Sequence, residues 1–534
     1  MLRSGPFVGR RKVLSISNSR LRWGLVALLA AAAAAAVFIT QPRPASHDAS
    51  IWVVVGRGML EGRPPFLGIW DYKPPAIYLV GALAWILDPG DTTVSMQALT
   101  VVAIAAAATA GGWLVATVYS RFWVGVATAA ALAGGLSLPA LSYGGGMSEL
   151  FGVAWLAVCF AIIAGIVLGR RGLLWPAAAG AIFALAVGSS FLTVGAVPAL
   201  AVLWLSIPID GVSYPPTRSN MRTWFRRRVL DGRLGVAIAA AAVVSLVVWW
   251  TVLAGGAVPA AIDAFVHYQS LYRAAGHLQP RAWVRGILDV WPLWIPTLIV
   301  CLTPTARGYL LGLNVLRSNF ARAMLVWLVV ELALLGFGQR FYARYLLLIV
   351  PPLIVLFGFT LCTLWVERPR ISRGVLTVAL CAAVAVGLLW QSLPTPSNDP
   401  QIAANADLAA YVRANSAPGE TIYVWGTDPD LYLRSDRQPA GPYLQIHPLI
   451  MPGYDQKAVA TMLDQWTAHP PRLVVASRAT NPDLIGLYPL NQSAAMTNPL
   501  RTYYAALAPL QSFIQSHYDL VATLPIGEVW RYRG

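Results

Sequence analysis

The sequence predicts a polytopic α-helical membrane protein with a small C-terminal α/β domain. Of its 534 residues, 57% are hydrophobic and only 12% are charged, whereas a soluble domain carries about 25% charged residues. Long uncharged runs recur from Trp23 to Trp390, and their lengths suit membrane helices of about 20 residues. After Gln391 the runs stop, and polar sequence continues to Gly534. This composition excludes an ordinary cytosolic enzyme, and it excludes a disordered chain because apolar residues are too abundant.

The net charge of +16 is concentrated in short basic clusters between the apolar runs. Cytoplasmic loops of membrane proteins are enriched in Lys and Arg, so the clusters indicate topology. No basic face with interleaved aromatic residues is evident, and we therefore expect no nucleic-acid partner. The clusters are Arg10, Arg11 and Lys12; Arg170 and Arg171; Arg222, Arg226, Arg227, Arg228 and Arg233; and Arg368, Arg370 and Arg373.

All four cysteines lie inside apolar runs and lack the spacing of metal ligands: Cys159, Cys301, Cys362 and Cys381. We expect them to be small buried apolar residues. The C-terminal polar sequence contains none, so neither a disulfide nor a zinc site is predicted.

The first apolar run, residues 24–40, is interpreted as a retained membrane span. It follows Arg20 and Arg22, which should hold residues 1–21 in the cytoplasm. A cleaved signal peptide is the alternative, but the run is longer than a typical signal core and residues 41–44 make a poor cleavage site. Residues 41–73 are therefore expected outside.

The next apolar stretch, residues 74–87, is short for a span. If it crossed the membrane, the arginine clusters at 170–171 and 222–233 would lie outside. If it lies along the outer membrane surface, every basic cluster becomes cytoplasmic, so we adopt this second interpretation. The model then has about eleven spans, namely the first run and residues 94–119, 122–141, 148–168, 173–188, 190–207, 234–254, 287–303, 323–337, 345–365 and 374–393.

This topology divides the chain into three parts: a cytoplasmic segment 1–21, a transmembrane module 22–393 that includes a first outer loop 41–88, and an extracytoplasmic domain 394–534. Residues 255–286 form a second outer loop. The short outer turn 338–344 contains two arginines, against the positive-inside trend. Charge placed against this preference suggests function.

The C-terminal domain reads as α/β. Helices are expected at 406–414, 458–467 and 503–516, and strands at 421–425 and 472–476. Residues 518–524 and 528–532 should close a hairpin around Pro525 and Gly527. No nucleotide-binding glycine pattern, P-loop or nucleophile elbow is evident.

The first outer loop carries the most informative residues. Asp48 directly follows the first span and opens a helix-like stretch. An ionisable residue at the membrane boundary among apolar neighbours is a candidate functional residue. The alternative is a structural helix cap. Downstream the loop contains the sequence Trp-Asp-Tyr-Lys-Pro-Pro at residues 70–75.

This arrangement resembles the GT-C glycosyltransferases, in particular the dolichyl-phosphate-mannose–protein mannosyltransferases, the lipid A aminoarabinose transferases and their bacterial relatives. The likeness is tight over residues 47–78 and extends in layout from about residue 20 to 395. Ser148 and Glu149 open a later span as an acidic residue does in these relatives, and residues 338–345 resemble their basic-aromatic outer turn. The chain departs from them at Ala49, where many relatives have a second acid, and at Arg344, where many have His.

The resemblance implies a site for transfer from a polyprenyl-phosphate-linked sugar to a lipid, glycan or protein acceptor. Asp48 would be the general base. The basic side chains Lys73, Arg340 and Arg344 would bind the donor phosphate. The side chains that would bind or orient substrate are Asp71, Glu149, Tyr342 and Tyr345. No cofactor is expected, and the single acid argues against a divalent metal.

Structural alternatives stay open for several of these residues. Asp71 would instead form a salt bridge with Lys73, and Glu149 would join two helices through a buried hydrogen bond. His47 is expected to be an exposed neighbour of Asp48. His267 and Tyr268 either line an acceptor groove or belong to an ordinary loop.

The function predicted from the sequence is an inverting glycosyltransferase at the outer face of the cytoplasmic membrane. A secondary transporter would predict internal repeats and ionisable residues paired along a path, and no repeat is found. A non-enzymatic membrane scaffold with a binding domain is the third possibility, and it predicts no particular role for Asp48 or Lys73.

Overall fold

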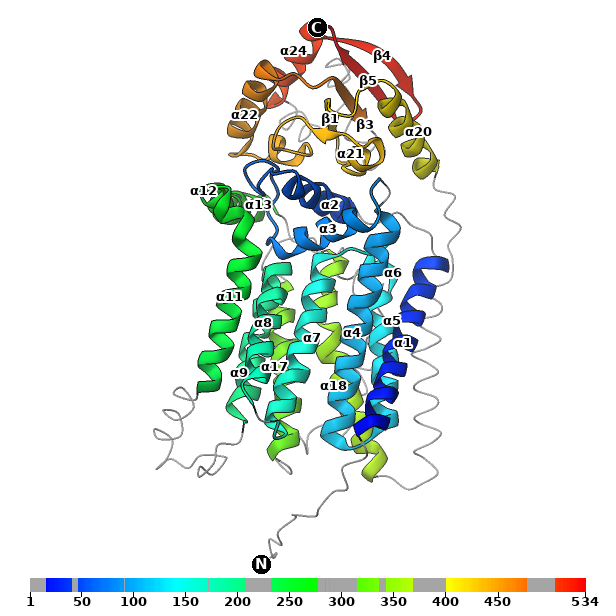
Figure 1. Cartoon of the computed structure of the whole chain (residues 1–534), viewed down its shortest axis with the longest axis vertical. Coiled ribbons are helices and arrows are strands. Elements are labelled where there is room, and N and C mark those ends of the chain that lie inside the picture. The colour runs from blue at the N-terminus through cyan, green and yellow to red at the C-terminus, as the bar shows by residue number, and fades with distance from the viewer. Residues whose placement is uncertain are drawn as a thin grey trace, which may run out of the picture.

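The computed structural model describes residues 16–40, 47–90, 92–170, 172–207, 232–276, 315–335, 342–367, 400–477 and 505–534, together with residues 284 and 288. Roughly parallel helices form a bundle, two short helices lie across one end of it, and an α/β region covers that end (Figure 1). The predicted span 374–393, all of the predicted span 287–303 except residue 288, most of the basic clusters and Arg340 lie outside the described residues.

The bundle helices coincide with the apolar runs of the sequence. They are α1 (Ile16–Thr40), α4 (Thr93–Tyr119), α5 (Phe122–Ser137), α7 (Ser148–Val167), α8 (Leu174–Ser189), α9 (Val197–Leu205), α11 (Gly232–Ala254), α17 (Val315–Leu335) and α18 (Val350–Glu367). Short helices α6 (Pro139–Ser142), η1 (Phe191–Ala196) and η4 (Ala343–Leu348) complete three of the predicted spans. Within the described residues, α1, α4, α7 and α11 are long and apolar enough to cross a bilayer. A helical membrane protein is thus confirmed, while the number of spans stays a prediction.

Small residues allow the bundle helices to approach closely, as is usual in membranes. A Cβ atom at Gly112 of α4 would lie 2.5 Å from the carbonyl oxygen of Gly125 on α5, and the reverse distance is also 2.5 Å. On α8, a Cβ atom at Gly180 would lie 1.9 Å from the carbonyl oxygen of Ala237 on α11. The central helix is α7, whose most apolar window is 78% buried, against 22% for α1 and 17% for α11.

Helices α2 (His47–Leu60) and α3 (Ala76–Leu87) lie across the end of the bundle, not along its axis (Figure 1). This orientation agrees with the interpretation of residues 74–87 as a surface helix. The two helices cross in close contact at a pair of glycines, one on each helix. A Cβ atom at Gly81 would lie 2.1 Å from the carbonyl oxygen of Trp52, and one at Gly56 would lie 2.3 Å from the amide nitrogen of Ala82. Only residues without a side chain permit this contact.

The C-terminal region contains α20 (Pro400–Ala414), β1 (Thr421–Trp425), α21 (Asp430–Ser435), β2 (Gln438–Pro439), η5 (His447–Ile450), α22 (Asp455–Ala468), β3 (Leu473–Ser477), α24 (Ala508–His517), β4 (Tyr518–Leu524) and β5 (Gly527–Tyr532). The sheet order is β2-β1-β3-β5-β4. Strand β1 is parallel to β2 and β3, and β5 is antiparallel to β3 and β4. Each predicted strand and helix has a counterpart here, but the sequence analysis missed α21 and β2 because both are very short.

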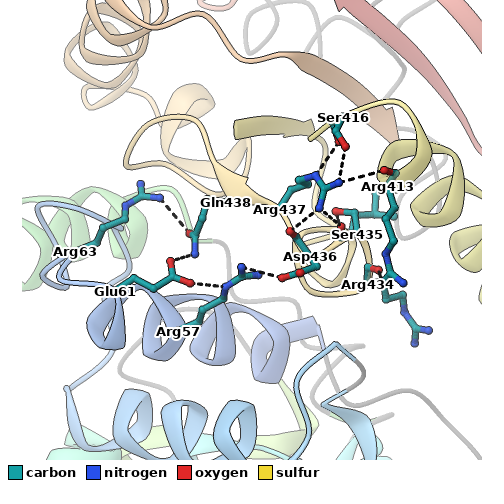
Figure 2. A network of polar contacts seen from close by, with 11 residues as sticks. Arg57, Glu61, Arg63, Arg413, Ser416, Arg434, Ser435, Asp436, Arg437 and Gln438 are labelled. Atoms are coloured by element: carbon teal, nitrogen blue, oxygen red, sulfur yellow. Dashed lines mark hydrogen bonds and ion pairs between the residues drawn. The ribbon is translucent and has the colours of Figure 1, made fainter. Parts of the chain in front are cut away.

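A polar network joins α2 to the C-terminal region (Figure 2). On α2, the Arg57 guanidinium pairs with Glu61 at 2.8 Å and with Asp436 at 2.9 Å. Arg63 donates to the carbonyl oxygens of Pro439 and Gly441 at 3.0 and 3.1 Å. These bonds fix the far end of α2, so the C-terminal region holds the helix that begins with His47 and Asp48.

The glycine crossing of α2 and α3 yields the first prediction. Gly81→Ala places a methyl group against the Trp52 carbonyl and should lower the free energy of unfolding by about 1–3 kcal/mol. Gly235→Ala in α11 is the matched control because a Cβ atom there meets nothing within 4 Å, and helix propensity should make it neutral or stabilising. Melting temperatures of the purified variants in detergent measure both effects. Equal melting temperatures for Gly81→Ala and the parent would contradict the close helix contact.

Candidate active site

Asp48 lies in the first turn of α2, at the end of the helix nearest η4 and α7. A carboxylate in this turn is favoured by the helix dipole. Its Oδ2 atom lies 2.7 Å from a guanidinium nitrogen of Arg344, and its Oδ1 atom lies 3.5 Å from Nδ1 of His47. Because α2 begins at His47, Asp48 stands inside the helix and its side chain is engaged by Arg344. The predicted base and one predicted phosphate ligand are therefore paired.

Lys73 and Glu149 form a second ion pair, with 3.0 Å between Nζ and Oε1. Lys73 directly precedes Pro74, which disfavours helical conformations of the Lys73 backbone. Glu149 is fully buried in the first turn of α7 and also accepts a hydrogen bond from the Ser148 hydroxyl at 3.1 Å. The expectation that Glu149 and Lys73 belong to one site agrees with this contact, although their chemical roles stay predictions.

A glycine turn brings α7 to Asp48. Residues 144–146 have φ values of +81°, +100° and +83°, which residues with a side chain rarely adopt. The amide of Gly146 donates to the Thr100 hydroxyl at 2.9 Å. A Cβ atom at Gly146 would lie 2.5 Å from the Cβ of Ala49. The start of α7 thus packs directly on the start of α2.

The electrostatic environments of the two pairs follow from burial and from mutual attraction. Burial acts to raise the pKa of the Asp48 carboxyl, but Arg344, His47 and Lys73 together outweigh it and hold that pKa below its usual value. Burial acts to lower the pKa of the Lys73 ammonium, but the Glu149 carboxylate raises it further, so the net pKa lies above its usual value. At neutral pH the pairs are therefore fully ionised, with two positive and two negative charges.

The environment of Asp71 shifts its pKa in the direction opposite to the shift at Asp48. Only 3% of its surface is exposed, and burial raises its pKa to about 6. Its Oδ2 atom lies 3.0 Å from the Tyr78 hydroxyl, which also accepts a hydrogen bond from the Lys73 amide at 3.1 Å and lies 2.8 Å from the Lys73 carbonyl oxygen. The alternative salt bridge between Asp71 and Lys73 is not formed, because the Lys73 ammonium bonds Glu149 instead.

A cavity of about 510 Å³ opens beside the Lys73 side chain. Most of its wall is apolar, and Lys73 and Arg273 are the basic side chains among the lining residues. Its walls come from the first outer loop, η1, the helical segment 263–274, the end of α17 and η4. The lining residues are Tyr72, Lys73, Pro74, Ser190, Phe191, Leu192, Phe265, Val266, Gln269, Ser270, Tyr272, Arg273, Leu334, Leu335, Tyr345 and Leu348.

Aromatic rings connect this cavity to the C-terminal region. Tyr268 is buried and lies edge-on to Trp70, with 4.6 Å between ring centroids. Tyr72 packs against Tyr268 and Tyr272 at 5.4 and 5.7 Å, and the hydroxyls of Tyr272 and Tyr342 lie 3.0 Å apart. Tyr268 is thus part of a packed cluster. His267, in contrast, pairs with Asp263 at 3.2 Å and is half exposed.

Of the basic-aromatic turn at residues 338–345, the structure describes residues 342–345. The Arg344 guanidinium carbon lies 4.6 Å from the Tyr342 ring centroid and 5.8 Å from that of Tyr345. The structure therefore brings Asp48, Lys73, Asp71, Glu149, Arg344, Tyr342 and Tyr345 into one region. Arg340 lies outside the described residues. Sequence analysis missed Tyr78, because an aromatic residue in an apolar run resembles a core residue, and Tyr272, because it lies in the second outer loop outside any motif.

The carboxylates of this region do not fit a divalent cation. In the described part of the chain, no three His, Cys, Asp or Glu side chains lie close enough to hold a metal ion. Asp48 faces Arg344 and Glu149 faces Lys73. The position after Asp48 is Ala49, which is fully buried against the glycine turn, so a second acid would not fit there.

Comparison with known proteins gives the fold. No protein-family model and no curated protein sequence matches the chain. Among solved structures, ArnT from Cupriavidus metallidurans bound to undecaprenyl phosphate has a TM-score of 0.54 at 13% identity, covering 97% of this chain and 98% of that one. The oligosaccharyltransferase of Archaeoglobus fulgidus, in complex with zinc and sulfate, has a TM-score of 0.53 at 14% identity and covers 94% and 72%.

A mycobacterial arabinofuranosyltransferase, AftD, has a TM-score of 0.52 at 15% identity, covering 96% of this chain and 41% of that one. These proteins are GT-C glycosyltransferases. The chain therefore has the GT-C glycosyltransferase fold, as the motifs of the first outer loop predicted. At these identities the likeness concerns the fold.

The raised pKa of Asp71 yields the second prediction. Because the folded-state pKa of about 6 exceeds the unfolded value of about 3.9, the folded protein is stabilised by the proton and loses stability as pH rises through this window. Asp71→Asn removes the titration and can still bond Tyr78. Its melting temperature should match the parent near pH 4 and exceed it at pH 7.5, by a stability difference on the order of 2–3 kcal/mol.

The control is Asp464→Asn, which removes an exposed carboxyl from α22. Thermal melts of the three proteins in detergent across this pH range make the comparison. Parallel pH profiles for the parent and Asp71→Asn would contradict the buried, proton-binding environment.

Proposed function

We propose that the chain is a membrane glycosyltransferase that moves a sugar from a polyprenyl-phosphate donor to a hydroxyl group of a lipid, glycan or protein acceptor. The observation that carries the proposal is an apolar cavity lined by Lys73, whose ammonium pairs with the buried Glu149 and lies near the partly buried Asp48–Arg344 pair. An apolar cavity with basic side chains in its lining has the chemistry of a lipid phosphate. ArnT, which shares the fold, was determined with undecaprenyl phosphate.

The donor would lie with its isoprenoid chain along the apolar wall of the cavity and its phosphate at Lys73. Leu192, Phe265 and Leu335 are among the apolar residues of this wall. Charge-assisted hydrogen bonds from a lysine or an arginine to phosphate are strong in such a partly buried place. Tyr345 also lines the cavity and would orient the phosphate or the sugar.

The reaction would be a single displacement. The acceptor hydroxyl oxygen forms a bond to the anomeric carbon while the bond from that carbon to the phosphate oxygen breaks, which inverts the configuration. The departing electron pair stays on the polyprenyl phosphate, where Lys73 and Arg344 stabilise the growing charge. The acceptor proton passes to Asp48 as general base. The step therefore needs no reactant besides the donor, the acceptor and the Asp48 carboxylate.

Arg344 must release Asp48 for this base to act. In the resting site, burial is outweighed by the nearby cations, and the pKa of Asp48 is held below its usual value, which makes the carboxylate a weak base. A donor phosphate brings negative charge that competes with Asp48 for the Arg344 guanidinium. Once Arg344 bonds the phosphate, the attraction that lowers the Asp48 pKa weakens. Donor binding would therefore prepare the base.

The placement of ionisable residues favours a transferase over a transporter. In the described bundle helices, the buried charged residues are Glu149 and Glu331. Glu149 is in the first turn of α7, and Glu331 lies about one helical turn before Leu335 at the cavity. Both therefore lie near the end of the bundle covered by the C-terminal region. A transport path would require such residues through the membrane.

The membrane orientation belongs to this proposal. Residues 1–21 would be cytoplasmic, residues 22–393 the transmembrane catalytic module in the cytoplasmic membrane, and residues 394–534 an extracytoplasmic domain. The basic clusters support this orientation. The C-terminal region covers the end of the bundle that carries α2 and α3 (Figure 1), so acceptor and donor would meet at the outer face.

The test of the base is Asp48→Asn. The amide keeps the size of the side chain but cannot accept the proton, so turnover should fall at least about 10²-fold. Because Arg344 is then freed from a carboxylate, the apparent donor affinity should be retained or improved. Sugar transfer from a short-chain polyprenyl-phosphate donor, measured over a range of donor concentrations, separates the two effects. Asp88→Asn, at the end of α3, is the control, and near-parental turnover of Asp48→Asn would return Asp48 to a structural role.

The test of the phosphate site uses a double variant. Lys73→Met alone would leave Glu149 buried without its cation, which is strongly destabilising. Lys73→Met with Glu149→Gln removes both charges and should fold. Loss of one charged hydrogen bond of about 1.5–3 kcal/mol should weaken apparent donor affinity roughly tenfold to more than a hundredfold.

The matched control removes another ion pair, with Arg533→Gln and Asp519→Asn on the distant β4–β5 hairpin. It should leave donor affinity unchanged. If the Lys73 and Glu149 double variant is folded and binds donor as the parent does, the phosphate lies elsewhere.

A further inference from the structure

A second cavity, of about 750 Å³, lies between α1, α4 and α7, far from the ion pairs. Its wall consists mainly of small apolar residues, and two arginines lie at one end. The lining residues are Arg20, Trp23, Gly24, Ala27, Leu28, Ala31, Val102, Ala105, Ala106, Thr109, Ala110, Trp113, Val158, Ala161 and Arg170. We name this cavity the α1 groove.

The α1 groove has the length of one membrane leaflet. Its residues on α1 run from 20 to 31 and those on α4 from 102 to 113, so each helix contributes about 17 Å at 1.5 Å per residue. Half of a bilayer hydrocarbon core of about 30 Å is about 15 Å. The arginine end lies where α1 begins, opposite the end of the bundle that carries α2 and α3 (Figure 1). On the proposed topology this is the cytoplasmic surface.

The arginines at that end are arranged for an anion. The Arg170 guanidinium carbon lies 5.1 Å from the Trp113 ring centroid and 4.2 Å from that of Trp175. Cation–π stacking uses the flat faces of a guanidinium, which leaves its in-plane N–H groups able to bond phosphate. Within the described part of the chain, no acidic side chain forms an ion pair with Arg20 or Arg170.

The structure also shows why Arg170 stays at the groove. A Cβ atom at Gly165 would lie 3.0 Å from Cδ and 3.3 Å from Nε of Arg170. The absence of a side chain at Gly165 therefore lets the arginine fold back against α7. A large side chain at this position would displace the guanidinium without removing its charge.

We propose that the α1 groove binds one anionic phospholipid of the cytoplasmic leaflet, with its acyl chains along α1 and α4 and its phosphate at Arg20 and Arg170. The groove length, the apolar wall and the basic end match this molecule. The lipid fills the space beside α1, whose apolar window is only 22% buried by protein. It thereby helps to hold the helix that leads to Asp48 against the bundle.

The test is native mass spectrometry of the full chain released from detergent that contains equal amounts of phosphatidylglycerol and phosphatidylcholine with the same acyl chains. The parent should retain one phosphatidylglycerol in preference. Arg20→Gln and Arg170→Gln should each weaken this binding about fivefold, the usual effect of one basic side chain at an anionic lipid surface. Gly165→Leu should act as Arg170→Gln does.

The matched control is Arg22→Gln, which removes the same charge from the same helix at a position outside the groove, where the guanidinium lies 5.7 Å from the Phe122 ring. It should retain the lipid. Size-exclusion chromatography confirms folding, and exposed Arg20 can be replaced without disturbing the core.

Three results would overturn the proposal. Equal retention of phosphatidylcholine would remove the role of the charge. Equal losses for Arg22→Gln and Arg20→Gln would show a general surface effect. Displacement of phosphatidylglycerol by undecaprenyl phosphate, one molecule for one and with the same dependence on Arg20 and Arg170, would assign the groove to a polyprenyl phosphate instead.

Discussion

Two largely buried ion pairs in one small region set the requirements for the surrounding structure. A carboxylate or a guanidinium removed from water is strongly disfavoured unless its partner is held in place. The Asp48–Arg344 and Lys73–Glu149 pairs join α2, the loop before α3, the first turn of α7 and η4. A shift of any one segment would leave a buried charge alone. The glycine contacts between α2 and α3, and between residues 144–146 and α2, bring these backbones close enough for both pairs to form.

The C-terminal region contributes from the other side. It bonds the far end of α2 through Arg57 and Asp436, and it holds Arg63 in the following turn through backbone carbonyls. A separate contact joins Asp263 to Lys457 and Tyr454, close to the helical segment that lines the cavity. The same region that covers the α2 and α3 end of the bundle therefore also fixes two walls of the proposed active site, which gives the α/β region a structural reason to accompany the membrane module.

The sequence predicted helices and strands more reliably than it predicted which side chains contact each other. Apolar runs located the bundle helices, and the logic of the basic clusters placed residues 74–87 along a surface. The motif of the first outer loop selected Asp48, Lys73 and Asp71, and the acidic start of the span at residue 148 selected Glu149. The sequence did not show which cation meets which carboxylate, because Lys73 and Glu149 meet only after α7 has packed on α2. The neighbours Asp71 and Lys73 turned out to have separate partners, since Asp71 reaches Tyr78 in α3.

Arg344 explains why the pKa values of two carboxylates in one site shift in opposite directions. Burial dominates at Asp71 and raises its pKa to about 6, whereas at Asp48 the effect of burial is outweighed chiefly by Arg344 and the pKa is lowered. Many relatives of the GT-C class have His at this position, and a histidine can release its partner by losing a proton. An arginine keeps its charge at every physiological pH. In the proposed mechanism, Asp48 would become a competent base only when another anion draws Arg344 away. The donor phosphate is the anion that the proposed reaction would supply, so an arginine at this position would couple activation of the base to occupation of the donor site.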